Sequence, residues 1–167
     1  VTSDILPTLC KLAGTRFPDV PLDGIDLMPL LQGNMKQRRK PIAFWNFPTL
    51  TNQDSKPYID PELQRGTTPL VKKSRGLFTR NFRNDHHPEI TEDDFNGARA
   101  IISGDYKLVI DGDKNTGVEL FNLRNDSAES NNLAGSQSVM VEKLKKEMRD
   151  WQASALNSLM EADYKSK

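Results

Sequence analysis

The stretch that decides the fold reads ARAIISGDYKLVI at residues 98–110 and continues as VELFNL at residues 118–123. Residues 98–102 and 106–110 are rich in β-branched and aliphatic side chains, which favour strands, and the Ser103-Gly104-Asp105 sequence between them is typical of a tight turn. Residues 118–123 alternate between apolar and polar side chains, which predicts a third strand with one face towards a core. Together these segments predict a small antiparallel sheet.

A helix near the end of the chain is predicted to cover this sheet. Its apolar residues recur at steps of three and four, with Lys, Glu and Arg on the other face: Val141, Leu144, Met148, Trp151, Ala155 and Leu159. Residues 41–47 are aromatic and β-branched and predict one further strand. The predicted fold class is therefore α+β, a sheet of three to four antiparallel strands with a C-terminal helix packed across one face.

The first 33 residues predict two helices. Thr2 or Ser3 is placed to cap a helix that ends at Gly14 and carries apolar side chains at Ile5, Leu6, Leu9, Leu12 and Ala13. A second, short helix is predicted over residues 27–31, with Gly33 at its end. Lys36, Arg38, Arg39 and Lys40 follow, and this run is interpreted as a solvated connector.

Residues 48–97 contain no sustained periodicity, and we interpret them as a long excursion in which a substrate or partner contact is expected. The candidate substrate-binding residues are His86, His87, Arg80 and Arg83, because His and Arg donate to anionic groups. The alternative is an exposed polar loop. The aromatic residues Trp45 and Trp151 are interpreted as core packing, and residues 111–115 as a polar hairpin loop rather than a calcium loop.

The composition limits the partners. Lys plus Arg and Asp plus Glu number 23 each, so the formal net charge is zero and a nucleic-acid partner is not expected. No apolar run approaches the roughly 20 residues that span a bilayer, and Val1 does not begin a recognisable export signal. Cys10 is the single cysteine, which rules out an intrachain disulfide. The compartment stays unassigned, with export of a parent protein as one open alternative.

Two sets of segments resemble the sulfatase family, hydrolases of the arylsulfatase and N-acetylgalactosamine-6-sulfatase type within the alkaline-phosphatase-like superfamily. The first set is similar to the passage that closes the large catalytic domain of these enzymes, and it consists of residues 2–9, 12–14, 22–27 and 29–33. The second set is similar to the small C-terminal subdomain, and it consists of residues 104–108, 119–123, Glu129, residues 132–134 and the helix that reaches Trp151. The resemblance implies that residues 1–33 end the catalytic domain and that residues 34–167 form the subdomain, with a variable excursion at 48–97.

The resemblance also implies which groups this chain does not carry. Sulfatases use a formylglycine made from a Cys/Ser-x-Pro-x-Arg motif and a calcium ion held by Asp and Asn side chains, mostly in the N-terminal half of the family. Cys10 is followed by Lys11, Leu12, Ala13 and Gly14, so the motif is absent there and Cys10 is expected to be a small core residue. We therefore expect no catalytic and no metal-binding residue in this chain, and no hydrolysis by the chain alone.

The expected role is to supply scaffold and one wall of the substrate cleft to a parent enzyme that hydrolyses sulfate esters. Its expected partners are the catalytic domain of that parent and a sulfated small molecule or carbohydrate, with self-association through residues 1–33 as a further option. Two alternatives stay open: a phosphodiesterase or phosphonate hydrolase of the same superfamily, and a non-catalytic binding or structural module.

Overall fold

The computed structural model describes residues 1–47, 73–74, 77–78, 89–112, 117–160 and 162–164. The chain divides into two compact units, residues 1–48 with 90–167, and residues 49–89. In the second unit, β2 (Lys73–Ser74) and β3 (Leu77–Phe78) pair as antiparallel strands. The other helices and strands belong to the first unit.

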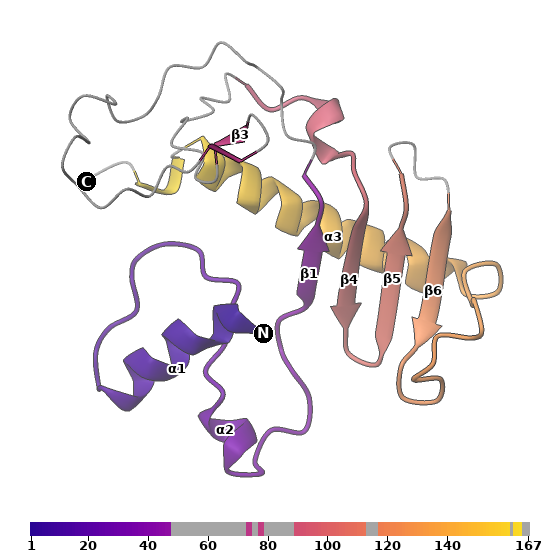
Figure 1. Cartoon of the computed structure of the whole chain (residues 1–167). Helices are drawn as coiled ribbons and strands as arrows, with labels where there is room; N and C mark the ends of the chain where they lie inside the picture. The colour runs from indigo at the N-terminus through magenta and orange to yellow at the C-terminus, as the bar shows by residue number, and fades with distance from the viewer. Residues whose placement is uncertain (48–72, 75–76, 79–88, 113–116, 161, 165–167) are drawn as a thin grey trace. The chain divides into compact units, whose positions relative to one another are not determined.

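Four antiparallel strands form the sheet of the first unit, in the order β1-β4-β5-β6 (Figure 1). They are β1 (Ile42–Trp45), β4 (Arg99–Ser103), β5 (Tyr106–Ile110) and β6 (Val118–Asn122). The β4–β5 turn has a positive φ of 60° at Gly104, which a residue without a Cβ adopts at low cost. The strands therefore form where β-branched and aliphatic residues flank turn residues, as the sequence predicts.

Helix α3 (Ser138–Leu159) lies across one face of this sheet (Figure 1). Alternate residues of the central strands meet the helix and form the hydrophobic core, which consists of Ile101, Leu108, Ile110, Leu120, Val141, Leu144 and Met148. All of them are buried. The predicted α+β class, a four-stranded antiparallel sheet with a C-terminal helix, is confirmed.

The buried stripe of α3 differs from the predicted one in its second half. After Leu144 and Met148 the buried residues are Gln152 and Leu156, whereas Leu159 is 43% exposed. The prediction followed the apolar residues, but the buried face continues in steps of four through a polar residue. Gln152 is accommodated because its Nε2 donates a hydrogen bond to the carbonyl oxygen of Phe95 at 3.2 Å.

The N-terminal region contains the 3₁₀ helix η1 (Thr2–Asp4), α1 (Ile5–Leu12) and α2 (Met28–Leu31). Both predicted ends have the expected geometry, with positive φ angles of 65° at Gly14 and 74° at Gly33. The predicted cap at Thr2 or Ser3 is wrong, because residues 2–4 are already helical and no side chain caps α1.

Asp4 holds this region together and corrects the interpretation of the basic connector. Its side chain is almost fully buried and accepts hydrogen bonds from both terminal nitrogens of Arg38, at 2.8 and 2.9 Å. It also accepts the backbone N–H of Ile25 at 2.8 Å. The Arg38 hydrogen bonds hold the pKa of Asp4 below its ordinary value of 3.8, although burial acts in the opposite direction. Arg38 is therefore an internal anchor rather than a solvated residue.

Candidate functional site

The four predicted substrate-binding residues, Arg80, Arg83, His86 and His87, lie outside the described residues. Their role stays a prediction. Of the predicted polar loop at 111–115, Asp111 and Gly112 are described. The structure does describe the residues on both sides of the long excursion, together with two hollows and one apolar surface.

The described residues that precede and follow the excursion meet at one end of the sheet. The backbone N–H of Asn46 donates to the carbonyl of Ala98 at 2.8 Å, and the indole Nε1 of Trp45 donates to the carbonyl of Asn96 at 2.7 Å. These bonds join β1 to the segment that leads into β4. The positions from which the excursion leaves and to which it returns are therefore fixed side by side.

A 3₁₀ helix, η3 (Glu92–Phe95), is fastened to α3 just before the chain returns to the sheet. The guanidinium of Arg149 lies 3.2 Å from the centre of the Phe95 ring and pairs with Glu92 at 2.6 Å. The hydrogen bond from Gln152 to Phe95 adds a buried contact. These interactions position residues 92–96 against the C-terminal half of α3.

A hollow of about 610 Å³ lies at this end of the sheet. The side chains of Phe44, Ala100 and Val109 are partly exposed there, and Asn46 and Asp111 add polar groups. Arg99 also borders it. This side chain is buried and donates to the carbonyl of Gly97 at 2.6 Å, with a longer contact to that of Gly112 at 3.4 Å. The hollow combines an apolar floor with a polar rim at the base of the predicted substrate loop.

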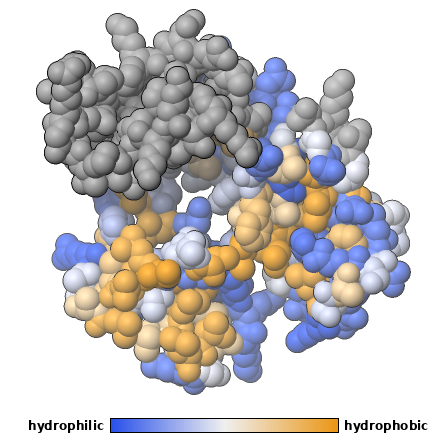
Figure 2. Space-filling model, in the orientation of Figure 1, coloured by the Kyte–Doolittle hydropathy of each residue, from blue (hydrophilic) through white to orange (hydrophobic). Residues whose placement is uncertain are grey.

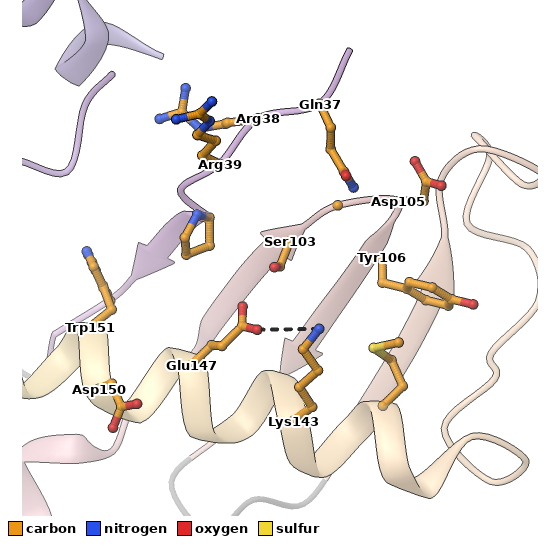
Figure 3. Close-up of a pocket in the computed structure, with 13 residues that line it drawn as sticks. Gln37, Arg38, Arg39, Ser103, Asp105, Tyr106, Lys143, Glu147, Asp150 and Trp151 are labelled. Atoms are coloured by element: carbon orange, nitrogen blue, oxygen red, sulfur yellow. Dashed lines mark ion pairs between the residues drawn. The ribbon is translucent and has the colours of Figure 1, made fainter. Parts of the chain in front are cut away.

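A second, larger groove of about 850 Å³ lies near the β4–β5 turn (Figure 3). One wall is the connector at residues 37–41, another is the turn itself, and the third is α3. Figure 3 shows Trp151 at one side of the groove and Tyr106 at the other, with Lys143 and Glu147 on the helix between them. This groove could not be predicted from the sequence, since its residues come from three segments far apart in the chain.

A surface rich in exposed apolar side chains covers α1 and α2, where the hydrophobic colour gathers in Figure 2. We call it the N-terminal apolar surface. Its members are between 47% and 73% exposed and are Ile5, Leu6, Leu9, Leu12, Phe17, Leu30 and Leu31. Exposed apolar surface of this kind is typical of protein–protein contacts, membrane contacts and ligand-binding grooves.

The described residues contain no group of three or more His, Cys, Asp or Glu side chains placed to hold a metal ion. Cys10 is half-buried on α1 and is a free thiol. No helix in the described part of the chain is both long and apolar enough to cross a membrane.

No family model matches the sequence. Two relatives illustrate the similarity to known proteins, one over a short segment and one over most of the chain. Arylsulfatase A of Bos taurus is 49% identical over 43 residues, which cover 26% of this chain and 8% of that protein. The ulvan-active sulfatase of Formosa agariphila is 28% identical over 152 residues, covering 89% of this chain and 28% of that protein. The chain resembles the C-terminal portion of sulfatases. The resemblance predicted from the sequence motifs is thereby confirmed.

Solved structures share the fold of this sulfatase-like chain. A candidate sulfatase from Bacteroides thetaiotaomicron matches with a TM-score of 0.52 and 19% identity, over 93% of this chain and 25% of that one. The complex of Ps i-CgsB with k-i-k-neocarrahexaose matches with a TM-score of 0.52 and 16% identity, over 98% of this chain and 29% of that one. This chain spans less than a third of the length of each of these proteins.

Proposed function

We propose that this chain is the C-terminal region of an enzyme that hydrolyses sulfate esters. In this proposal it supplies scaffold and one wall of the substrate cleft, and a separate catalytic portion supplies the nucleophile. The calcium ion and the formylglycine implied by the resemblance belong to that catalytic portion. The observation that carries the proposal is the N-terminal apolar surface.

The N-terminal apolar surface belongs to a region that is held by internal polar contacts, although Nε of Arg38 is buried without a hydrogen-bond partner. Asp4 is buried against Arg38, and Thr8 Oγ1 accepts the backbone N–H of Leu27 at 3.0 Å while it donates to the carbonyl of Asp4 at 2.7 Å. Ile5, Leu6, Leu9 and Leu12 are each about half exposed, so their full burial adds about 3 to 6 kcal/mol. A region that is held together by polar contacts and presents apolar side chains on its outside is suited to docking on a larger body.

The sulfatases to which the chain is similar are more than three times its length, so they contain the additional structure that such docking requires. We therefore propose the catalytic portion of the same enzyme as the occupant of the N-terminal apolar surface. A second copy of this chain is the alternative occupant. A measurement of the oligomeric state distinguishes the two occupants.

The wall of the cleft is assigned to the excursion and to the hollow at its base. The contacts of Trp45 with Asn96 and of Arg149 with Phe95 hold in place the described residues beside the excursion, and binding residues are often carried on loops that a fixed scaffold positions. A sulfated carbohydrate is the proposed substrate class. It is supported by the names of an ulvan-active relative and of a structural neighbour that binds neocarrahexaose.

The reaction is tested on the complete protein that contains this chain. We expect it to hydrolyse an aryl sulfate in the presence of calcium far faster than the corresponding phosphate diester or phosphonate monoester. Faster hydrolysis of the phosphorus esters would assign the protein to the phosphodiesterase or phosphonate hydrolase alternative. If the complete protein hydrolysed none of these esters, the result would favour a non-catalytic module.

The docking role is tested by Leu9→Glu in the same complete protein. We expect a lower yield of active enzyme and a lower melting temperature, because a buried unpaired carboxylate would face the catalytic portion. The matched control is Val139→Glu on α3, where the native side chain is 85% exposed. Equal behaviour of the two variants would show that α1 is not covered.

A further inference from the structure

One turn of α3, residues 149–152, contacts several other elements of the first unit, and we call it the α3 junction. Within it, Gln152 donates a hydrogen bond to the carbonyl of Phe95 in η3 at 3.2 Å. Trp151 reaches a different part of the chain, because its indole Nε1 donates to the carboxylate of Asp23 at 3.0 Å. Asp23 lies between α1 and α2, 128 positions before Trp151. The α3 junction therefore connects the N-terminal region with η3.

Asp23 is presented to the α3 junction by a backbone that is held in place on its C-terminal side. The N–H of Ile25 donates to the buried carboxylate of Asp4 at 2.8 Å. Gly24 packs so closely on the backbone of Ser3 that a Cβ at this position would lie 1.9 Å from the Ser3 carbonyl oxygen. No larger residue fits there without a shift of the backbone. The N-terminal region therefore fixes where the Asp23 carboxylate stands.

The ring of Trp151 packs on Trp45 of β1, and Trp45 in turn contacts residues on both sides of the base of the excursion. The two indole rings meet edge to face, with their centres 6.2 Å apart. Trp45 meets Phe47 in the same way at 4.9 Å, and its Nε1 donates to the carbonyl of Asn96 at 2.7 Å. Phe47 stands at the start of the excursion, and Asn96 stands in the segment that leads into β4. A continuous path of contacts therefore runs from Asp23 to both segments, and we call it the contact path.

The hydrogen bond to Asp23 controls how the Trp151 indole is turned. Because a hydrogen bond from an indole N–H is directional, the position of the acceptor selects one side-chain rotamer of the ring. That rotamer sets which edge of the ring Trp45 meets, and an edge-to-face pair loses contact when one ring turns. Asp23 is exposed, so water competes for its carboxylate and the bond adds little to the stability of the fold. Its main effect is on the orientation of the two rings.

We infer that Asp23 and Trp151 are positioning residues that set the orientation of the base of the excursion relative to the N-terminal region. The inference rests on the proposed function, in which the N-terminal region docks on the catalytic portion and the excursion forms one wall of the cleft. Under that proposal, the hydrogen bond determines how the wall faces the catalytic portion. It therefore affects the binding of a substrate long enough to reach the wall, and has less effect on a substrate that is too short.

The contact path is tested in the 167-residue chain, whose two tryptophans give two indole N–H signals in NMR spectra. Spatial continuity alone does not show coupling, so a change at Asp23 must be detected at Trp45. Trp151→Phe removes one signal and assigns the other to Trp45. We expect Asp23→Leu to shift both signals and to speed hydrogen exchange of the Trp45 indole by about twofold to fivefold. An unchanged Trp45 signal in this variant would overturn the inference.

Two matched variants separate the hydrogen bond from a general effect of substitution. Asp23→Asn keeps a side-chain oxygen that accepts the indole N–H, so both indole signals should stay close to those of the wild-type chain. Asp105→Leu removes a different carboxylate, which pairs with Arg124 at 3.2 Å on the surface, and should leave both signals unchanged. Thermal denaturation confirms that each variant is folded. Equal signals in Asp23→Leu and Asp105→Leu would show that Asp23 has no positioning role.

The effect on substrate binding is tested in the complete protein with two sulfate esters, one of an oligosaccharide and one of a small aryl alcohol. We expect Asp23→Leu to raise KM for the oligosaccharide about twofold to fivefold more than KM for the aryl ester, and Asp23→Asn to restore the wild-type ratio. A merely structural role would lower the active fraction and hence kcat for both esters, without a change in the ratio of the KM values. An unchanged ratio in Asp23→Leu would contradict the inference.

The two experiments keep this inference distinct from the proposed function. If the complete protein hydrolyses neither ester, the proposed function fails, while the indole signals still decide whether Asp23 acts on Trp45. If hydrolysis is observed but neither the indole signals nor the KM ratio responds to Asp23→Leu, the positioning role fails alone.

Discussion

At the scale of single residues, Asp4 combines near-complete burial with four donors, which are the two terminal nitrogens of Arg38, the N–H of Ile25 and, at 3.5 Å, the N-terminal nitrogen of Val1. We predict that Asp4→Asn lowers the free energy of unfolding of the N-terminal region by about 2 to 3 kcal/mol, because Arg38 loses its counterion while remaining mostly buried. Hydrogen exchange of α1 measures the change. Asp105→Asn is the control, since its pair with Arg124 is exposed and contributes less than about 1 kcal/mol.

The same carboxylate predicts a pH dependence. The folded-state pKa of Asp4 is lowered from 3.8, so the ionised form is favoured by folding and its contribution is fully present above that value. We expect the contribution to disappear as the pH falls below 3.8 and through the folded-state pKa. Exchange rates in α1 measured at descending pH test this. The wild-type chain should lose protection in this window, whereas Asp4→Asn should show no such loss.

The roles of Asp4 and Arg38 could not be read from local sequence. Asp4 stands beside a helix start, where an acidic residue ordinarily serves as a cap, and Arg38 stands in a basic run that predicts a solvated segment. Their pairing joins positions 34 residues apart. Periodicity reports which face of one element is apolar, but it carries no information on such a contact between distant segments.

At the scale of elements, the four strands of the larger sheet were predicted well, because each is bounded by turn residues and contains β-branched side chains. The short strands β2 and β3, which lie in the excursion, were not predicted. The second half of α3 was predicted with the wrong face, because Gln152 is polar and yet 2% exposed. Its burial depends on the carbonyl of Phe95, which belongs to η3. A polar residue in a core is predictable only when its partner is known.

Gln152 supplies the prediction at this scale. We expect Gln152→Leu to lower the free energy of unfolding by about 1 to 3 kcal/mol. The leucine side chain is similar in size to that of glutamine, but it leaves the Phe95 carbonyl without its hydrogen-bond donor. Thermal denaturation measures the loss. Asn157→Leu on the same helix is the control, as Asn157 is exposed. If Gln152→Leu were as stable as the wild-type chain, the bond would not be what fastens η3 to α3.

At the scale of the whole molecule, the first unit contains two kinds of surface. The sheet and α3 enclose a hydrophobic core, whereas α1 and α2 are held by polar contacts and present apolar side chains outward. The sequence predicted this contrast from the stripe at Ile5, Leu6, Leu9 and Leu12. It could not predict what covers the stripe, because the covering atoms do not belong to these residues.

The last prediction concerns how this chain behaves by itself in solution. Burying the four half-exposed side chains of α1 contributes about 3 to 6 kcal/mol per copy, or about 6 to 12 kcal/mol for two copies. The loss of translational and rotational freedom on association costs about 4 to 15 kcal/mol, so the net gain is small. Since about 4 kcal/mol corresponds to a dissociation constant near 1 mM, we expect a monomer at micromolar concentration and weak self-association only as millimolar concentration is approached. Sedimentation across this range measures the association, and Leu9→Glu should abolish it while Val139→Glu should not. A dimer that persists at micromolar concentration and is broken by Leu9→Glu would identify a second copy, rather than a catalytic portion, as the occupant of the N-terminal apolar surface.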